Sequence, residues 1–216
     1  MAKNGYELVV FDMDGVLVDV HSSWAFVHDH FDVSNDHSLE AYLNGEIDDL
    51  EFIRRDIALW KQKKEGISKS DLKKILKNVP IMPGYEDCLE CFKEDGFKTA
   101  IISGGLKPLA LMIGKDYFDH IKANDVDTDG KKLNGEGILE VPLNDKGKVF
   151  DELIRQLDIS PEKTVSVGNS FIDAPMLERS GLGISFDPAD EKVRYAADMV
   201  ITEKDLTKVW KTVSSL

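Results

Sequence analysis

Cysteine is scarce in this chain: two of 216 residues, Cys88 and Cys91, stand three positions apart in the stretch EDCLECFKEDG. A second Cys or His pair at zinc-binding spacing is missing, so these two residues do not predict a zinc site. Both fall on one face of an expected helix. We therefore expect them to pack against the protein interior.

Long apolar runs are missing as well, because no stretch approaches the length that a bilayer-spanning helix needs. The first residues, MAKNGYELVV, lack the order of basic, apolar and small residues that marks a signal peptide. Internal repeats and low-complexity segments are also absent. We therefore expect a cytoplasmic globular protein that does not bind membranes.

Basic residues are in the minority, with 27 Lys and Arg against 40 Asp and Glu and a formal net charge of -13. This balance argues against nucleic acid binding through a basic surface. Acidic groups near an anionic substrate would repel it unless a divalent cation lay between them. The composition therefore fits a protein whose partner is a small molecule, and it leaves the oligomeric state open.

Strands and helices alternate from Pro83 onward, which predicts βαβ units, a parallel sheet and right-handed crossovers. The short apolar runs KTAIIS, TVSVG and LGISF are expected to be strands, with helices between them. The stretch DVDTDGKKLNGEGILEV carries the Asp-Gly and Asn-Gly signals of a β-hairpin. The expected fold class is therefore α/β, with a doubly wound, Rossmann-like parallel sheet.

A helical pattern interrupts this alternation directly after the first expected strand. Its clearest part is an apolar stripe at steps of three and four residues, made of Ile47, Leu50, Ile53, Ile57 and Trp60. We expect a core formed by residues 1–18 and 81–216, with a small inserted helical cap subdomain at 19–80. Such an insertion is a common way to build a lid over a site.

Two aspartates follow the first expected strand, in the stretch VVFDMDG. The apolar run ends at Phe11, so Asp12 and Asp14 lie where a buried parallel strand opens into a loop. Ligands bind at the carboxyl ends of the strands in an open α/β sheet. A lone pair of this kind could equally be a helix cap and a turn former, so the downstream motifs decide between the two.

Three later stretches carry polar side chains at corresponding points of the chain. IISGG places Ser103 and Gly104 at a strand end, where a hydroxyl and N–H groups suit a phosphoryl oxygen, although a turn also needs glycines. Lys146 of NDKGK begins an expected helix, and the helix dipole disfavours a cation at that end unless an anion of the site lies beside it. The alternative is an ordinary surface lysine. GNSFID places Asn169 and Asp173 where they could ligate a hard cation or cap a helix.

Together these pieces, DMDGVLVD, IISGG, the lysine of NDKGK and GNSFID, resemble in order the four motifs of the haloacid dehalogenase-like (HAD) hydrolases. The resemblance covers almost the whole chain. The helical segment after the first motif, the stretch GYEDCLECFKEDGFKTAIISGG and the hairpin before DKGK are most similar to the phosphoserine phosphatase-like group. The resemblance implies an HAD-like core with a cap, and a Mg²⁺-dependent phosphatase that forms an aspartyl-phosphate.

The resemblance also implies a role for each motif residue. Asp12 would be the nucleophile, and Asp14 would protonate the leaving oxygen and later activate water. Ser103, the N–H of Gly104 and Lys146 would hold the phosphoryl oxygens. A carboxylate and a phosphate repel each other, which explains why a metal ion and a lysine are needed.

The implied Mg²⁺ would lie between Asp12, the carbonyl of Asp14 and the loop that carries Asn169 and Asp173. Many members of the family have an acidic residue where this chain has Asn169, and a neutral amide would hold the metal more weakly or leave more to Asp173. This departure favours the alternative of a non-catalytic phosphate-binding regulatory module. The presence of the other motif residues favours an enzyme.

The cap departs from phosphoserine phosphatases too. Those enzymes have DxDST followed by a glutamate for the substrate amine, whereas this chain has DMDGV, with His21 near the glutamate position. The candidates for an arginine that binds the substrate carboxylate are Arg54 and Arg55, and the alternative for both is a solvated helix face. We therefore expect a phosphatase for a small phosphorylated metabolite, with phosphoserine phosphatase proper as the second possibility.

Overall fold

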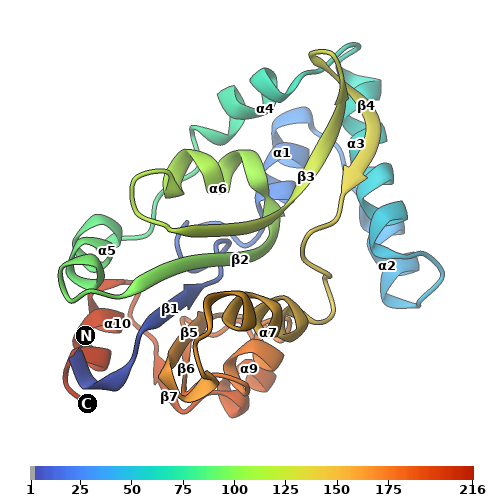
Figure 1. The fold of residues 1–216 in the computed structure, drawn as a ribbon. Coiled ribbons are helices and arrows are strands. Elements are labelled where there is room, and N and C mark those ends of the chain that lie inside the picture. Colours follow the sequence, from blue (N-terminus) through green and yellow to red (C-terminus); the bar gives the residue numbers. More distant parts are fainter. Residues whose placement is uncertain (1–2) are drawn as a thin grey trace.

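A seven-stranded sheet forms the centre of the computed structural model, which describes residues 3–216 (Figure 1). The strand order is β4-β3-β2-β1-β5-β6-β7, and every neighbouring pair is parallel except the antiparallel hairpin β3–β4. The strands are β1 (Leu8–Phe11), β2 (Lys98–Leu106), β3 (His120–Asp129), β4 (Lys132–Ile138), β5 (Thr164–Gly168), β6 (Leu182–Phe186) and β7 (Met199–Ile201). The predicted α/β class and the predicted hairpin are confirmed.

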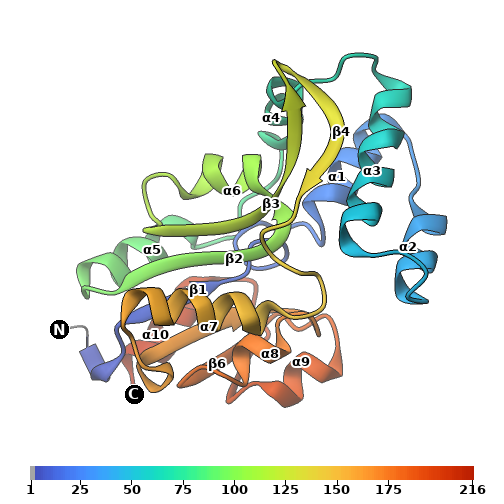
Figure 2. The ribbon, with the colours of Figure 1, turned by 45° about the vertical axis from the view of Figure 1, so that its right-hand side comes forward.

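Helices cover both faces of the sheet (Figures 1 and 2). The helices of the described chain are α1 (Ser23–Phe31), α2 (Asp36–Leu43), α3 (Asp49–Lys63), α4 (Lys69–Leu76), α5 (Tyr85–Glu94), α6 (Lys107–Gly114), α7 (Lys146–Leu157), α8 (Ala174–Leu177), α9 (Glu191–Ala196) and α10 (Thr207–Ser214), with short 3₁₀ turns η1 (Lys3–Gly5) and η2 (Pro161–Lys163). Helices α1 to α4 lie beyond the carboxyl edge of the sheet, beside the β3–β4 hairpin (Figure 2). Val9 and Phe11 of β1 join a buried cluster with α5 and α10, whereas Leu8 and Val10 join a second cluster with α7. Alternate residues of a strand point to opposite faces, so the sheet is doubly wound. Among the described residues, no helix combines the length and the apolar composition that crossing a bilayer requires.

The two cysteines lie on α5, where the sequence predicts a packing role. Cys88 is buried in the main core, Cys91 is partly exposed, and neither forms a disulfide. Burial raises the pKa of the Cys88 thiol, which keeps it protonated and unreactive. The prediction is confirmed for Cys88 and holds only in part for Cys91.

Strand β1 lies in the middle of the sheet, between β2 and β5. Its last residue, Phe11, pairs with Ile101 on one side and with Val167 on the other. The next N–H, that of Asp12, donates to the Val167 carbonyl at 2.9 Å. The loops after β1, β2 and β5 therefore meet at one edge of the sheet, at the topological switch point where α/β folds bind ligands.

The β3–β4 hairpin rises beyond the carboxyl edge of the sheet and packs against the helices that follow β1 (Figure 2). Gly137 of β4 approaches α3 so closely that a Cβ at this position would lie 2.3 Å from Ile53 Cγ2. On the other side, Lys69 Nζ of α4 lies 2.7 Å from Asp125 Oδ2 of β3. The hairpin therefore joins the inserted helices to the strands of the core.

Helix α3 carries the predicted apolar stripe but begins later than the stripe does. Asp48 caps the helix by accepting a hydrogen bond from the Glu51 N–H at 2.8 Å, so Ile47 lies before the first turn. The fully packed part of the stripe is Ile53, Ile57 and Trp60. Trp60 stacks on Trp24 of α1 with the ring centroids 5.3 Å apart, which fixes these two helices against each other.

Candidate active site

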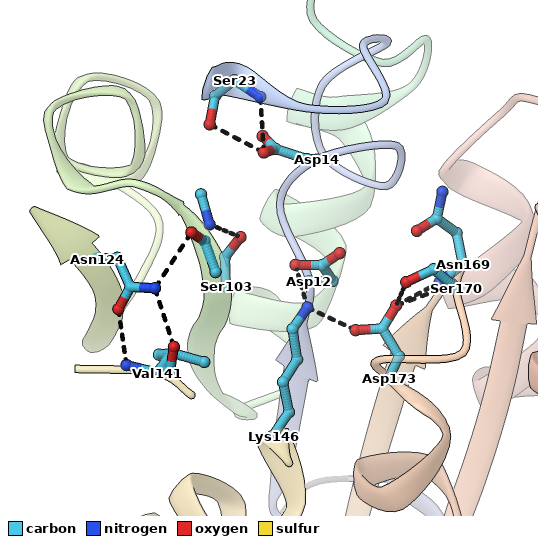
Figure 3. Close-up of polar contacts among 12 residues, drawn as sticks. Asp12, Asp14, Ser23, Ser103, Asn124, Val141, Lys146, Asn169, Ser170 and Asp173 are labelled. Atoms are coloured by element: carbon cyan, nitrogen blue, oxygen red, sulfur yellow. Dashed lines mark hydrogen bonds and ion pairs between the residues drawn. The ribbon is translucent and has the colours of Figure 1, made fainter. Parts of the chain in front are cut away.

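The side chain of Lys146 reaches the carboxyl edge of β1 and lies between two buried carboxylates (Figure 3). Its Nζ atom is 2.7 Å from Asp12 Oδ1 and 2.6 Å from Asp173 Oδ1. Lys146 is the first residue of α7, which Asp145 caps by accepting a hydrogen bond from the Lys148 N–H. Three residues that the sequence singles out in three separate motifs are thus in direct contact.

Burial and neighbouring charges shift the pKa values in this cluster. Burial, followed by the charge of Asp173, raises the pKa of Asp12, although Lys146 pulls it down. Burial disfavours the Lys146 ammonium, but Asp12 and Asp173 outweigh that effect and raise the pKa of Lys146. Two carboxylates and one ammonium leave surplus negative charge when all are ionised, so the cluster would stabilise a further cation.

Asp173 holds the cluster together and has both of its oxygens engaged. Oδ1 faces Lys146, while Oδ2 accepts hydrogen bonds from the Asn169 N–H at 2.9 Å, the Ser170 N–H at 3.0 Å and the Ser170 hydroxyl at 3.2 Å. This geometry does not support the expectation that Asp173 ligates a metal. It fits a residue that orients Lys146 and the loop after β5.

Asp14 is held by a residue that sequence reasoning missed. The N–H and the hydroxyl of Ser23, the first residue of α1, each donate to Asp14 Oδ2 at 2.8 Å (Figure 3). Burial raises the pKa of Asp14, and the hydrogen bonds from Ser23 counteract this in part. An Asp-Ser pair nine residues apart gives no recognisable signal, since the contact depends on how α1 docks.

Strand β2 presents the Ser103 hydroxyl near its carboxyl end, next to a shift in the register of its pairing with β3. The Gly105 N–H donates to Ser103 Oγ at 3.1 Å, so the hydroxyl proton remains available for a phosphoryl oxygen. The carbonyl of the intervening Gly104 accepts hydrogen bonds from Trp24 Nε1 at 3.1 Å and from Asn124 Nδ2 at 3.3 Å. Two donors from different elements therefore fix this peptide.

Asn124 is a second residue that sequence reasoning missed, and it is fully buried. Its Nδ2 also donates to the Val141 carbonyl at 2.9 Å, and its Oδ1 accepts from the Val141 N–H (Figure 3). The same Oδ1 accepts from the Glu140 N–H. The amide thereby ties the chain after the hairpin to the Gly104 loop. A single asparagine just before the expected hairpin carried no sign of this role.

Two groups near Asp12 carry oxygen atoms that form no hydrogen bond within the described chain and could therefore bind a metal ion. Among the described residues, the Asn169 side chain and the Asp14 carbonyl take part in no hydrogen bond. The two groups are neighbours, because Gly15, at φ +78°, lies so close to the amide that a Cβ would be 2.1 Å from Asn169 Nδ2. With the carboxylate of Asp12 they form an all-oxygen donor set, since an amide can turn its oxygen inward. These residues fit Mg²⁺.

His21 lies beside this region. A cavity of about 470 Å³ opens between the start of α1 and the loops after β5 and β6, and its wall includes Gly15, His21, Asn169 and Lys204. The structure thus places His21 in the same cavity wall as Asn169 of the loop after β5. Contact with a substrate stays a prediction.

Arg54 and Arg55 do not reach the site. Both belong to α3, where Arg54 is half-buried and Arg55 is exposed. Arg54 Nε lies 2.6 Å from Glu136 Oε2, and Arg55 Nε lies 2.9 Å from Glu51 Oε1. Helix periodicity places them on α3 correctly but does not show which side of the helix meets the hairpin. The expectation that they bind substrate is corrected: Arg54 fastens α3 to β4, and Arg55 lies on a solvated face.

The chain matches a family model described as haloacid dehalogenase-like hydrolase over residues 6–181. It is 30% identical over 207 residues to phosphoserine phosphatase of Archaeoglobus fulgidus, which covers 92% of this chain and 57% of that protein. It is 27% identical over 214 residues to phosphoserine phosphatase of Idiomarina loihiensis, covering 96% of this chain and 93% of that protein. This chain thus spans little more than half of one relative and nearly all of the other.

Solved structures share the fold. One described as a phospho-aspartyl intermediate analogue of phosphoserine phosphatase has a TM-score of 0.79 at 23% identity, covering 96% of this chain and 98% of the other. An unliganded probable phosphoserine phosphatase from Vibrio cholerae has a TM-score of 0.80 at 21% identity, covering 99% and 67%. At these identities the likeness shows the architecture of core and inserted helices.

Proposed function

Because the chain belongs to the haloacid dehalogenase-like hydrolase family, we propose that it is a Mg²⁺-dependent phosphomonoester hydrolase acting on a small phosphorylated metabolite. The observation that carries the proposal is the buried contact of Lys146 with both Asp12 and Asp173 at the carboxyl edge of β1. Relatives named phosphoserine phosphatase support the same reaction class.

The first step transfers the phosphoryl group to the protein. A carboxylate oxygen of Asp12 attacks phosphorus, and the bond from phosphorus to the ester oxygen breaks. Protonated Asp14 gives its proton to the departing oxygen, so the alcohol leaves neutral. Lys146 and the Ser103 hydroxyl hold the phosphoryl oxygens on which charge develops.

The second step releases inorganic phosphate. Asp14, now ionised, takes a proton from a water molecule that attacks the phosphorus of the aspartyl-phosphate. The bond between phosphorus and the Asp12 oxygen breaks, and Asp12 returns as a carboxylate. Each aspartate therefore ends the cycle in its starting protonation state.

Asp12, the carbonyl of Asp14 and the amide oxygen of Asn169 are the groups that would hold Mg²⁺. The bound ion would supply positive charge between the nucleophile and the phosphate, which otherwise repel each other. Asn169 is a neutral ligand, so this site has one negative charge fewer than a site with an acidic residue there. Asp173 contributes by orienting Lys146 and the loop after β5.

We assign residues 19–80 as a cap subdomain and residues 1–18 and 81–216 as the core. The two ends of the insertion lie side by side, which supports this division: the Asp19 N–H donates to the Pro80 carbonyl at 2.8 Å, and the Met82 N–H donates to the Leu17 carbonyl at 3.0 Å. Ser23 and Trp24, at the start of α1, bond from the cap to Asp14 and to the Gly104 carbonyl. A cap that touches the reacting groups can exclude water from them.

The test is hydrolysis of p-nitrophenyl phosphate, a substrate that makes few demands on the cap. We expect turnover that requires Mg²⁺ and that Asp12→Asn abolishes, with the variant's thermal unfolding measured as a control for folding. Phosphate binding without turnover, in the wild type with saturating Mg²⁺, would instead identify the chain as a non-catalytic phosphate-binding module.

A further inference from the structure

We infer that Ser23 is a positioning residue for Asp14: it occupies one carboxylate oxygen and thereby makes the other the proton carrier for the leaving group. The inference rests on the proposed function, in which Asp14 is the general acid. It concerns a residue outside all four motifs and belonging to the inserted helices.

The donor arrangement at Ser23 is fully determined by its neighbours. The N–H of Leu106, at the end of β2, donates to Ser23 Oγ at 2.9 Å. Because Oγ accepts this bond, its own proton is free to point at Asp14 Oδ2, 2.8 Å away. The Ser23 N–H reaches the same Oδ2 atom at 2.8 Å. Ser23 is completely buried, so water does not compete for these bonds.

The two oxygens of Asp14 are therefore unequal. Oδ2 accepts two hydrogen bonds, whereas Oδ1 is buried and has no hydrogen-bond partner among the described residues. The Ser23 N–H can only donate, so it disfavours a proton on Oδ2, and the protonated form of Asp14 is expected to carry its proton on Oδ1. A buried polar atom without a partner is costly unless a ligand satisfies it, and the ester oxygen of a bound phosphomonoester would do so.

Close packing keeps this arrangement in place. A Cβ on Gly105 would lie 2.6 Å from Asp14 Oδ2 and 2.7 Å from Ser23 Oγ, so only glycine leaves room for the pair. Ser23 begins α1, and Leu106 ends β2. The acid is therefore oriented only while the first cap helix rests on the core, which couples cap position to proton transfer.

The experiment compares two aryl esters that differ mainly in leaving-group basicity, p-nitrophenyl phosphate and phenyl phosphate. The basic phenolate needs a proton in the transition state more than nitrophenolate does. We expect Ser23→Ala to lower kcat/KM for phenyl phosphate about tenfold more than for p-nitrophenyl phosphate, a fraction of the effect of a whole general acid. Ser23→Cys keeps the side-chain volume with a weaker donor and should change the ratio in the same direction.

The matched control is the neighbouring Ser22→Ala, which removes the helix cap that the Ala25 N–H uses but leaves Asp14 untouched. It should lower both rates equally or not at all. In an Asp14→Asn background, Ser23→Ala should cause no further change in the ratio. Equal losses on both esters from Ser23→Ala and from Ser23→Cys would overturn the inference, while the proposed function would stand as long as Asp12→Asn abolishes wild-type turnover.

Discussion

The ammonium nitrogen of Lys146 lies 2.6 Å from Asp173 Oδ1, and both side chains are buried. Asp173 is in turn fixed by three donors from the loop after β5. One carboxylate thus connects the loop after β5 to the cation that faces Asp12. The consequences of this link can be measured.

Asp173→Asn should weaken that connection. The amide keeps the size of the side chain but loses the charge that holds Lys146, so we expect a loss of about 1–3 kcal/mol in unfolding free energy and at least about tenfold in kcat. Urea denaturation and p-nitrophenyl phosphate turnover measure the two. The control is Glu7→Gln, which breaks an exposed pair of the same 2.6 Å length with Lys163 and should change neither quantity. Equal effects of the two substitutions would contradict this role.

Asn169→Asp should tighten metal binding. A carboxylate in place of the neutral amide adds charge to the proposed donor set, so the Mg²⁺ concentration for half-maximal activity should fall about tenfold. Isothermal titration of the protein with Mg²⁺ gives the same comparison without turnover. Asn169→Ala should shift both measurements the opposite way, and an unchanged Mg²⁺ requirement in both variants would exclude residue 169 as a ligand.

Trp24→Phe should loosen the Ser103–Gly104 segment that we propose holds the phosphoryl group. Phenylalanine keeps an aromatic ring against Trp60 but removes the N–H that the Gly104 carbonyl accepts. We expect the inhibition constant of inorganic phosphate to rise about three- to tenfold, as the loss of one hydrogen bond implies. Trp60→Phe removes an indole N–H that bonds to His28 instead, so it should cost stability and spare phosphate affinity. The reverse pattern would rule out the proposed role of Trp24.

The chain should show no preference for a substrate carboxylate. Arg54 and Arg55 are engaged on the outside of α3, and Lys204, in the cavity wall, is 2.6 Å from Asp19. O-phosphoethanolamine is phosphoserine without its carboxylate, so the ratio of the two kcat/KM values isolates that group. We expect a ratio near one or in favour of O-phosphoethanolamine, unchanged by Arg54→Ala. A strong preference for phosphoserine would show that a cationic residue reaches the site after all.

Asp71, at the start of α4, should make the free energy of unfolding depend on pH. Hydrogen bonds from Lys64, then from Ser68, hold the pKa of Asp71 well below its usual range. A depressed folded-state pKa stabilises the protein above the unfolded value of about 4, and this stabilisation is lost as the pH falls towards the folded-state pKa. Asp71→Asn should therefore cost about 1 kcal/mol at pH 7, with the difference from wild type shrinking below about pH 4. Urea denaturation at both pH values measures this, and a pH-independent difference would contradict it.

Ligands bind at the carboxyl ends of the strands in an open α/β sheet, and this explains how much of the site the sequence could predict. Asp12 and Asn169 directly follow β1 and β5, and Ser103 lies near the carboxyl end of β2. The parallel pairing of these strands brings the three residues to the same edge of the sheet without further information. Lys146 stood out because a cation at a helix N-terminus needs a nearby anion, and it has two. Local pattern and sheet topology singled out these residues, and the resemblance of the four motifs to the HAD hydrolases favoured a site over the structural alternatives.

The remaining contacts depend on docking, which no local pattern encodes. Ser23 and Trp24 reach the site only because α1 packs on the end of β2. Asn124 reaches it because the start of the β3–β4 hairpin lies beside Gly104. The same limit explains the error over Arg54, whose partner Glu136 lies on a distant strand. Periodicity indicates that a residue is on a helix surface, whereas tertiary packing decides what covers that surface.

Capture of the phosphorylated protein tests the nucleophile most directly. Asp14→Asn should still accept the phosphoryl group from p-nitrophenyl phosphate, whose leaving group needs little protonation, but should release it slowly. With Mg²⁺, rapid acid quenching and mass spectrometry of the peptides should then show one phosphoryl group on Asp12. An adduct on any residue other than Asp12 would contradict the mechanism. So would the combination of two results: Asp14→Asn turns over steadily without an adduct, and Asp12→Asn keeps full turnover.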